Sequence, residues 1–227
     1  MFVSNFMSYP VRTVGPDTLV PEARKIMSAA SCRHLPVVDE SKLLLGIITD
    51  RDIRSALPSK VVDQGEMTEC LHRFETLPVK RIMTETVTCL TVEATLDDAL
   101  ILFEEHKVGA LPVLDADNRI VGILALNDLL KAYKKLFGLG VRGSSLIVVK
   151  DNGKPHPLTR LTEILEAREV PFTRLIRTGD NDRDTLIYIR IHTHKLHAIY
   201  HALAEAGFET VAPHPISLES PGFLRRE

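Results

Sequence analysis

The chain has 227 residues, and its 28 Lys and Arg residues nearly balance its 30 Asp and Glu residues, so the formal net charge is −2. Hydrophobic residues make up 44% of the chain, which is typical of a folded globular protein and excludes global disorder. Residues 1–143 carry 17 positive and 19 negative charges, and residues 144–227 carry 11 of each. Neither part has the basic surplus that binding to a nucleic acid backbone requires.

Three cysteines, Cys32, Cys70 and Cys89, occur without any Cys-x-x-Cys pair, so neither a disulfide framework nor a zinc knuckle is indicated. Such cysteine usage favours a reducing compartment. The first seven residues lack the basic and apolar regions of a secretory signal, and the densest apolar stretch, Leu43–Ile48, is about a third of a membrane span. We therefore expect a cytoplasmic protein without membrane contact.

The first predicted elements are a helix, two strands and a second helix. Apolar residues at helical spacing predict the first helix: Val20, Ala23, Met27 and Ala30. Two short apolar runs, Leu35–Val38 and Leu43–Ile48, predict buried strands joined by a polar turn. The second helix is expected to open at Asp50 as its N-cap, with Asp52 in the first turn. Beyond it, a short helix is predicted near Met67–Phe74.

The same pattern recurs 76 residues later. Met7–Leu57 aligns without a gap to Met83–Tyr133, and eleven of the 51 pairs are identical. At frequencies of roughly 7% for common residues, chance predicts only three or four. A helical stripe, two apolar runs and a helix opening at Asn127 return in the second copy: Leu96, Ala99 and Phe103, then Leu111–Leu114, Ile120–Leu124 and Asp128. Each copy is predicted as strand, helix, strand, strand, helix, and units this small bury more surface when two pack together.

This doubled pattern resembles a tandem pair of cystathionine-β-synthase (CBS) domains, a Bateman module. The resemblance is carried by Arg33–Asp39 and Gly46–Asp52 in the first copy and by Leu111–Asp115 and Gly122–Asp128 in the second. It implies that adenine nucleotides bind in the cleft between the copies and that this binding regulates an attached or partner protein.

The resemblance also implies which residues bind the ligand, because the family motif is Gly-x-Thr/Ser-x-x-Asp. In the first copy, Asp52 would accept hydrogen bonds from both ribose hydroxyls, and Thr49 would donate one to the phosphates. Nearby basic side chains would face the phosphates, and valines would enclose the adenine. The candidate site residues are Val11, Arg33, His34, Val37, Thr49, Arg51, Asp52, Val87, Asn127 and Asp128. The alternative reading is that Thr49 and Asp52 only cap a helix.

The second copy departs from the motif. It keeps Gly122 and Asp128 but has Ala125 in place of the hydroxyl, and Gly109–Ala110 where the first copy has Arg33–His34. We therefore expect one strong site centred on Thr49 and Asp52, and one weak or empty site.

From Ser144 the pattern changes to a predicted βαββαβ order, which is ferredoxin-like. The predicted elements are a strand at Leu146–Val149, a helix through Leu158, Leu161, Ile164 and Leu165, strands at Thr173–Arg177 and Leu186–Ile191, a helix over Lys195–Ala206 capped by Gly207, and a strand at Phe208–Val211. The run Ala202–Val211 resembles the ACT domain, a regulatory module that binds amino acids. The loop Asp151–Leu158 lacks the family's Asp-x-Pro-Gly-x-Leu pattern.

A CBS pair followed by an ACT domain is similar to the acetoin-utilisation protein (AcuB) family, which implies a link to acetoin or acetate metabolism. The expected fold class is α/β (α+β). The expected segments are 1–57 (first CBS domain), 58–78 (connecting insertion), 79–137 (second CBS domain), 138–143 (linker), 144–213 (ACT-like domain) and 214–227 (tail).

Other motifs have weaker interpretations. Gly138–Gly143 matches Gly-x-Gly-x-x-Gly but follows a helix and precedes a strand, which is the wrong context for a dinucleotide site. His197 and His201 are i, i+4 neighbours that could hold a surface metal ion, although a polar helix face is the simpler interpretation. No catalytic motif is present.

The sequence thus predicts a non-catalytic regulatory protein, forming a homodimer, that senses AMP, ADP or ATP and acts on an enzyme or protein that the sequence does not name. The alternatives are an amino-acid sensor centred on the ACT-like domain and a ligand-free interaction scaffold. No metal and no catalytic cofactor are expected.

Overall fold

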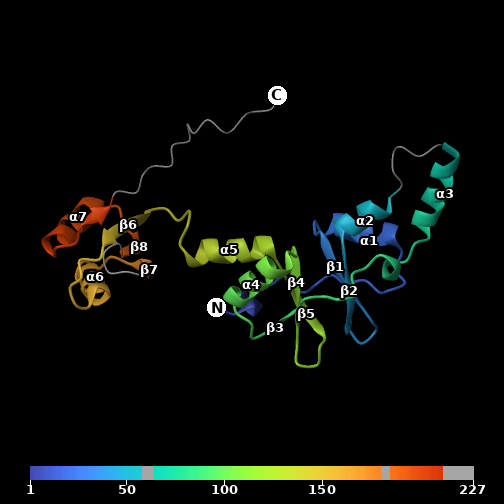
Figure 1. Cartoon of the computed structure of the whole chain (residues 1–227), viewed down its shortest axis with the longest axis horizontal. Helices are drawn as coiled ribbons and strands as arrows, with labels where there is room; N and C mark the ends of the chain where they lie inside the picture. The colour runs from blue at the N-terminus through green and yellow to red at the C-terminus, as the bar shows by residue number, and fades with distance from the viewer. Residues whose placement is uncertain (58–63, 180–184, 212–227) are drawn as a thin grey trace. The chain divides into compact units, whose positions relative to one another are not determined.

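The computed structural model describes residues 1–57, 64–179 and 185–211 (Figure 1). The chain forms two compact units, Met1–Ala132 and Tyr133–Glu227, and each is described by itself. The expected tail 214–227 and residues 180–184 of the polar connection before the strand at Leu186 lie outside the described residues.

The first copy of the repeat contains two helices and an antiparallel strand pair. Its elements are α1 (Val20–Ala29), β1 (His34–Val38), β2 (Leu44–Thr49) and α2 (Asp50–Ala56). Strand β1 pairs with β2 from His34 opposite Thr49 onward, so the first residue of one strand lies beside the last residue of the other. The apolar stripe of α1 packs against the strands, with Val20 and Ala23 fully buried. Helix α3 (Gln64–Glu75) follows and covers the expected helix near Met67–Phe74.

The second copy repeats this order, which confirms the duplication. Its elements are β3 (Leu90–Thr91), α4 (Leu96–His106), β4 (Ala110–Leu114), β5 (Ile120–Ala125) and α5 (Leu126–Leu136). Strand β3 pairs in parallel with β4, and β4 pairs antiparallel with β5. The predicted stripe residues Leu96, Ala99 and Phe103 are all buried.

Four details of the predicted copies are wrong. In the first copy the initial strand is reduced to a single parallel bridge between Val14 and Val37. Ala30 lies beyond the last turn of α1 as its exposed C-cap and takes no part in the apolar stripe. Helix α2 is capped by Thr49 rather than Asp50, because the Thr49 hydroxyl accepts the Asp52 amide hydrogen. Helix α5 begins at Leu126, so Asn127 lies inside the helix and is not its N-cap.

Each copy is completed by the segment that precedes the other copy. Val79, in the short 3-10 helix η2 (Val79–Arg81), donates its amide hydrogen to the Thr18 carbonyl at 2.8 Å and is buried in the first copy's core. Val3, in η1 (Val3–Asn5), donates in the same way to Ala94 of the second copy at 2.8 Å. Val3 and Val79 are 76 residues apart, so the exchange is reciprocal. The boundaries expected from the sequence do not anticipate it.

A second pair of contacts follows the same symmetry. Thr84 and Ile47 exchange two backbone hydrogen bonds of 2.9 Å, and Ser8 and Ile123 exchange the equivalent pair. The chain passes so close that glycine is required on the receiving strand. A Cβ atom on Gly46 would lie 2.8 Å from the Thr84 carbonyl oxygen and 2.8 Å from Met83 Sδ.

The C-terminal unit is a four-stranded sheet with two helices, in the predicted βαββαβ order. Its elements are β6 (Ser144–Lys150), α6 (Pro157–Glu166), β7 (Phe172–Thr178), β8 (Leu186–His192), α7 (Leu196–Glu205) and β9 (Thr210–Val211). The sheet order β7-β8-β6-β9, with every pairing antiparallel, is that of a ferredoxin-like fold (Figure 1). Gly207 follows α7 with φ of +82°, as expected for the predicted C-cap.

One face of this sheet forms the unit's core. Alternate residues of β6 and β8 are fully buried against α6 and α7, among them Ile147, Ile189 and Ile191. Leu158 lies on the exposed side of α6, although it was expected in the apolar stripe. None of the helices in the described part of the chain is long and apolar enough to cross a membrane.

Replacing Gly46 tests the packing of the exchanged segment. We expect Gly46→Ala to lower the free energy of unfolding by about 1–3 kcal/mol, because the new methyl group meets backbone that cannot move aside. Gly122→Ala should cost less, because the three atoms nearest to its Cβ would all belong to the flexible Met7 side chain. Urea denaturation of each variant measures the difference.

Gly15→Ala is the matched control, because its nearest neighbour, Thr18 Oγ1, lies at an ordinary 3.8 Å. A loss of stability at Gly15 equal to that at Gly46 would contradict the packing argument.

Candidate ligand-binding groove

An open groove of about 1,020 Å³ runs between the two copies. This volume is at the upper end of the roughly 300–1,000 Å³ typical of small-molecule sites. Residues from equivalent positions of both copies line it, so the groove consists of two half-sites related by the repeat. It contains all the predicted site residues except one: Val11, Arg33, His34, Thr49, Arg51, Asp52, Val87, Asn127 and Asp128.

Val37 is the exception. Its side chain is fully buried in the core of the first copy and does not reach the groove. The reason is its position in β1, where it pairs with Gly46 and bridges Val14, so its side chain faces the helices. The apolar lining instead comes from Val11 and Val87, together with Ile47, Ile123 and Val108.

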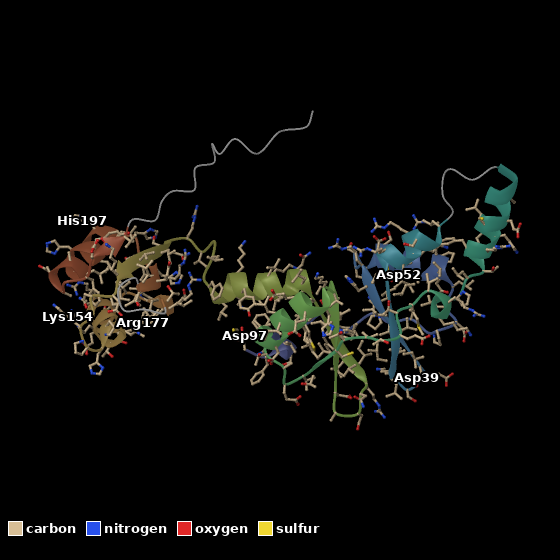
Figure 2. The ribbon with its side chains drawn as sticks, in the orientation of Figure 1. Asp39, Asp52, Asp97, Lys154, Arg177 and His197 are labelled. Atoms are coloured by element: carbon tan, nitrogen blue, oxygen red, sulfur yellow. The ribbon has the colours of Figure 1, made fainter. Side chains whose placement is uncertain are left out.

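Thr49 and Asp52 form a capping box at the start of α2 (Figure 2). Asp52 Oδ2 accepts hydrogen bonds from the Thr49 amide at 2.8 Å and from the Thr49 hydroxyl at 2.6 Å. The hydroxyl hydrogen that we expected to reach a phosphate is therefore already donated to Asp52. The second carboxylate oxygen, Oδ1, accepts no hydrogen bond from any described residue, so it is available to a ligand.

The second half-site differs in the same place. Ala125 has no hydroxyl, and only its amide contacts Asp128 Oδ2, at 3.4 Å. The other oxygen of Asp128 is 3.2 Å from Lys131 Nζ, in an ion pair of adjacent helical turns. The residue equivalent to Lys131 in the first copy is Ser55, so Asp52 has no such competitor.

Basic side chains dominate the first half-site. Arg12, Arg33 and Arg51 line the groove, and none of them forms an ion pair with a residue in the described ranges. Arg54 is paired with Asp50 at 3.0 Å, an exposed contact of adjacent helical turns. This half-site therefore offers an anionic ligand three arginines without carboxylate partners.

His34 connects the two half-sites. It begins β1 in the first copy, and a Cβ atom on Gly109 of the second copy would lie only 2.8 Å from its Nε2. The side chain thus packs directly on the backbone of the other copy, where glycine leaves room for it. Burial lowers the pKa of His34, the nearby Arg33 lowers it further, and Asp52 partly opposes both effects. His34 is consequently neutral at pH 7.

Several lining residues have no counterpart in the sequence prediction, namely Arg12, Cys32, Arg54, Lys107 and Lys131. Of these, only the position of Lys131 could have been predicted from the sequence, because it follows Asp128 at helical i, i+3 spacing. Cys32 and Arg54 are sequence neighbours of predicted site residues, whereas Arg12 and Lys107 come close to Thr49 and Asp52 only through folding. Burial raises the pKa of the Cys32 thiol, so it is not a reactive thiolate.

The alternative interpretation of His197 and His201 as a surface metal site gains no support. His201 Nδ1 lies 3.4 Å from Glu205 Oε2, and His197 is exposed on α7 (Figure 2). Within the ranges that the structure describes, no three His, Cys, Asp or Glu side chains are arranged to hold a metal ion.

The capping box can be tested by exchanging the residues of the two copies. Thr49→Ala should lower the free energy of unfolding by about 1 kcal/mol, because it removes the cap of α2. Ala125→Thr should raise it, since a threonine there can form the missing box with Asp128. Thermal unfolding measures both. A destabilised Ala125→Thr variant would show that the two helix starts are not equivalent.

The His34 pKa predicts an effect of acid. Its pKa in the folded protein is below the ordinary 6.5, so protonation favours the unfolded state. Stability linked to His34 is therefore fully present above about pH 6.5 and is lost as the pH falls through the lower, folded-state pKa. His34→Gln should flatten this acid dependence in denaturation curves at pH 5 to 8. An imidazole NMR titration of His34 centred above 6.5 would refute the argument.

Comparison with known proteins agrees with the duplicated fold. The family model for the CBS domain matches residues 3–59 and 79–135, just over half of the chain. A CBS domain-containing protein of Dictyostelium discoideum is 34% identical over 136 residues, which are 60% of this chain and 93% of that protein. The inosine-5'-monophosphate dehydrogenase of Methanocaldococcus jannaschii is 35% identical over 157 residues, which are 69% of this chain. Of that enzyme's own length, the match covers only 28%.

Solved structures give the same result. CBSX2 in complex with AMP has a TM-score of 0.50 at 27% identity, covering 60% of this chain and 97% of that one. A Vibrio cholerae protein assigned to acetoin utilization (AcuB) has a TM-score of 0.51 at 30% identity, covering 61% and 96%. The CBS pair of MJ0100, in complex with 5-methylthioadenosine and S-adenosyl-L-methionine, has a TM-score of 0.50 at 28% identity, covering 60% and 97%. The repeat, its groove and these matches together place this chain in the CBS domain family, with a tandem CBS pair in its first 135 residues.

Proposed function

We propose that this protein is a non-catalytic regulator whose CBS pair senses an adenine nucleotide, AMP, ADP or ATP, in the groove between the copies. The observation that carries the proposal is that Asp52, whose Oδ1 accepts no hydrogen bond from a described residue, lines the same groove as three arginines that form no ion pair within the described ranges. A ribose diol needs an acceptor of this kind, and phosphates need the positive charge. CBS pairs similar to this one have been solved with AMP and with S-adenosyl-L-methionine.

In the proposed complex, Asp52 accepts hydrogen bonds from the ribose hydroxyls. Arg33 and Arg51 face the phosphates, and Val11 and Val87 enclose the adenine from the two copies. Thr49 acts mainly by holding the Asp52 carboxylate in place, since its hydroxyl is hydrogen-bonded to Oδ2 at 2.6 Å. This role replaces the direct phosphate contact expected from the motif.

The second half-site is proposed to bind weakly or not at all. Lys131 already occupies one oxygen of Asp128, and Gly109 and Asn127 stand where the first copy has Arg33 and Arg51. A nucleotide there would have to displace an ion pair and would meet fewer cations. Binding to the chain should therefore show one dominant site.

Calorimetric titration of AMP, ADP and ATP into the full chain tests the proposal. Asp52→Asn keeps an oxygen for the helix cap but removes the charge, and we expect it to weaken binding by about tenfold or more, since hydrogen bonds to charged groups contribute roughly 1.5–3 kcal/mol. Asp128→Asn is the matched control and should leave the dominant affinity nearly unchanged. Equal affinity in wild type and Asp52→Asn would reject the site.

Regulation follows from where the groove lies. A ligand that contacts both copies binds some arrangements of the copies better than others, and it shifts the population only by that difference in affinity. The exposed apolar side chains of Leu100, Ile101 and Leu130 stand where the first copy has Arg24, Lys25 and Arg54. This contrast supports a homodimer formed through the second copy, and the free cysteines are consistent with a cytoplasmic location.

The C-terminal unit is proposed to be an ACT-like domain over residues 144–213 that transmits or receives the signal. Its βαββαβ order and sheet order support this assignment. The loop after β6 is tied internally, because Asp151 pairs with Arg177 and Asn152 donates to the Gly207 carbonyl (Figure 2). The similarity to the AcuB protein of Vibrio cholerae supports, as part of the same proposal, control of acetoin or acetate-type metabolism through a partner yet to be identified.

A further inference from the structure

The sheet of the C-terminal unit carries two adjacent arginines on the face opposite its helices. Arg174 in β7 and Arg190 in β8 are direct cross-strand partners. The residues next to them, Leu175 and Ile189, are also partners and pack against the core formed with α6 and α7. Because side chains alternate along a strand, both guanidinium groups project from the other face.

Both guanidinium groups are held in place by neutral neighbours. The Arg174 guanidinium carbon lies 4.7 Å from the centre of the Phe137 ring, a cation–π distance. Arg190 Nη1 is 3.4 Å from Ser144 Oγ, a long hydrogen bond, and Ser144 Oγ itself donates to the Gly138 carbonyl. These contacts fix the direction of each side chain but supply no negative charge.

No described residue forms an ion pair with either arginine. The Nε atoms of Arg174 and Arg190 are buried, and neither has a hydrogen-bond acceptor among the described residues. Like charges directly opposite each other on two strands are destabilising. In the described parts of β6, β7 and β8, the positions on this face hold no Asp or Glu: Ser144, Leu146, Val148, Lys150, Arg174, Ile176, Thr178, Leu186, Tyr188, Arg190 and His192. Lys150 is the other basic residue of this set, and it pairs with Glu209.

Burial and the neighbouring charge both change the pKa of Arg190. Burial lowers its pKa from the ordinary value, and the charge of Arg174 lowers it further. Buried donors of charged groups are normally satisfied by protein, ordered water or a bound ion. A pair that remains unsatisfied in a sheet therefore needs a physical explanation, and a negatively charged ligand supplies one.

We propose that Arg174 and Arg190 form an oxyanion-binding site on the face of the C-terminal sheet opposite α6 and α7, which takes a small carboxylate- or phosphate-bearing molecule. A guanidinium presents parallel N–H donors that match the oxygens of a carboxylate or phosphate, and two neighbouring guanidinium groups can share one such anion. The site is separate from the nucleotide groove and does not depend on the function proposed for it.

The arginine Nε–H resonances report on the site directly. In ¹H–¹⁵N spectra of the full chain, inorganic phosphate and succinate are titrated separately at constant ionic strength set with chloride. We expect the Nε–H signals of Arg174 and Arg190 to shift together and saturably with at least one of the anions. The anion with the lower dissociation constant identifies the phosphate or the carboxylate class.

Variants separate bidentate recognition from general charge attraction. Arg190→Lys keeps the positive charge but loses the parallel N–H donors of the guanidinium group, so it should weaken binding of the preferred anion by about tenfold. Arg168→Gln, at an exposed position in the turn after α6 of the same unit, is the control and should leave the affinity unchanged.

Two results would overturn the proposal. One is that neither Nε–H signal of the wild-type chain moves with phosphate or with succinate, a result that does not require any variant to fold. The other is that Arg190→Lys and Arg168→Gln bind with the affinity of the wild type. Loss of nucleotide binding in Asp52→Asn bears on neither result, so the two proposals fail separately.

Discussion

The reciprocal exchange of short segments between the two copies is the constraint on which the N-terminal unit depends. Val79 completes the core of the first copy, and Val3 makes the equivalent contact with the second, each fully buried and each with a backbone hydrogen bond of 2.8 Å. Neither copy can form its complete core from contiguous residues. Because the exchange brings β2 beside Thr84 and β5 beside Ser8, it also positions the strand ends that line the groove. The fold and the candidate site therefore share one cause.

The duplication sets a symmetric scaffold, and a few substitutions make the groove asymmetric. Where the first copy has Thr49, the second has Ala125. One aspartate is therefore held by a full capping box, and its equivalent by one long contact with the Ala125 amide and an ion pair with Lys131. His34 packs on Gly109 across the groove, and the equivalent residue of the second copy, Ala110, is too short to do the same. Two identical half-sites would bind two ligand molecules with equal affinity, whereas these differences favour binding at the first half-site.

The repeat made much of the fold predictable from sequence. An ungapped offset of 76 residues shows the pattern of each element twice, so the order of elements predicted from one copy is supported by the other. The helix starts were wrong by one or two residues, because Thr49 is a better cap than the aspartate beside it once Asp52 closes the box. The prediction that Val37 lines the groove is wrong, because its side chain is buried in the core. Side chains alternate between the two faces of a strand, but a continuous apolar run such as Leu35–Val38 does not show which of them face the core. The exchanged segments, Arg12 and Lys107 could not be predicted, because they approach the site only through tertiary structure.

The near-zero net charge of the whole chain conceals two local imbalances of charge. Arg12, Arg33 and Arg51 line the groove and form no ion pair with a described residue, although Asp52 and Asp128 line it as well. On the C-terminal sheet, Arg174 and Arg190 are cross-strand partners, and the Nε atom of neither has a hydrogen-bond acceptor among the described residues. Electrostatic energy depends on distance and burial rather than on the sum of charges, because an exposed pair is screened by solvent and a buried one is not. A chain can therefore be neutral as a whole and still bind anions at two places, provided that its compensating acids lie elsewhere on the surface.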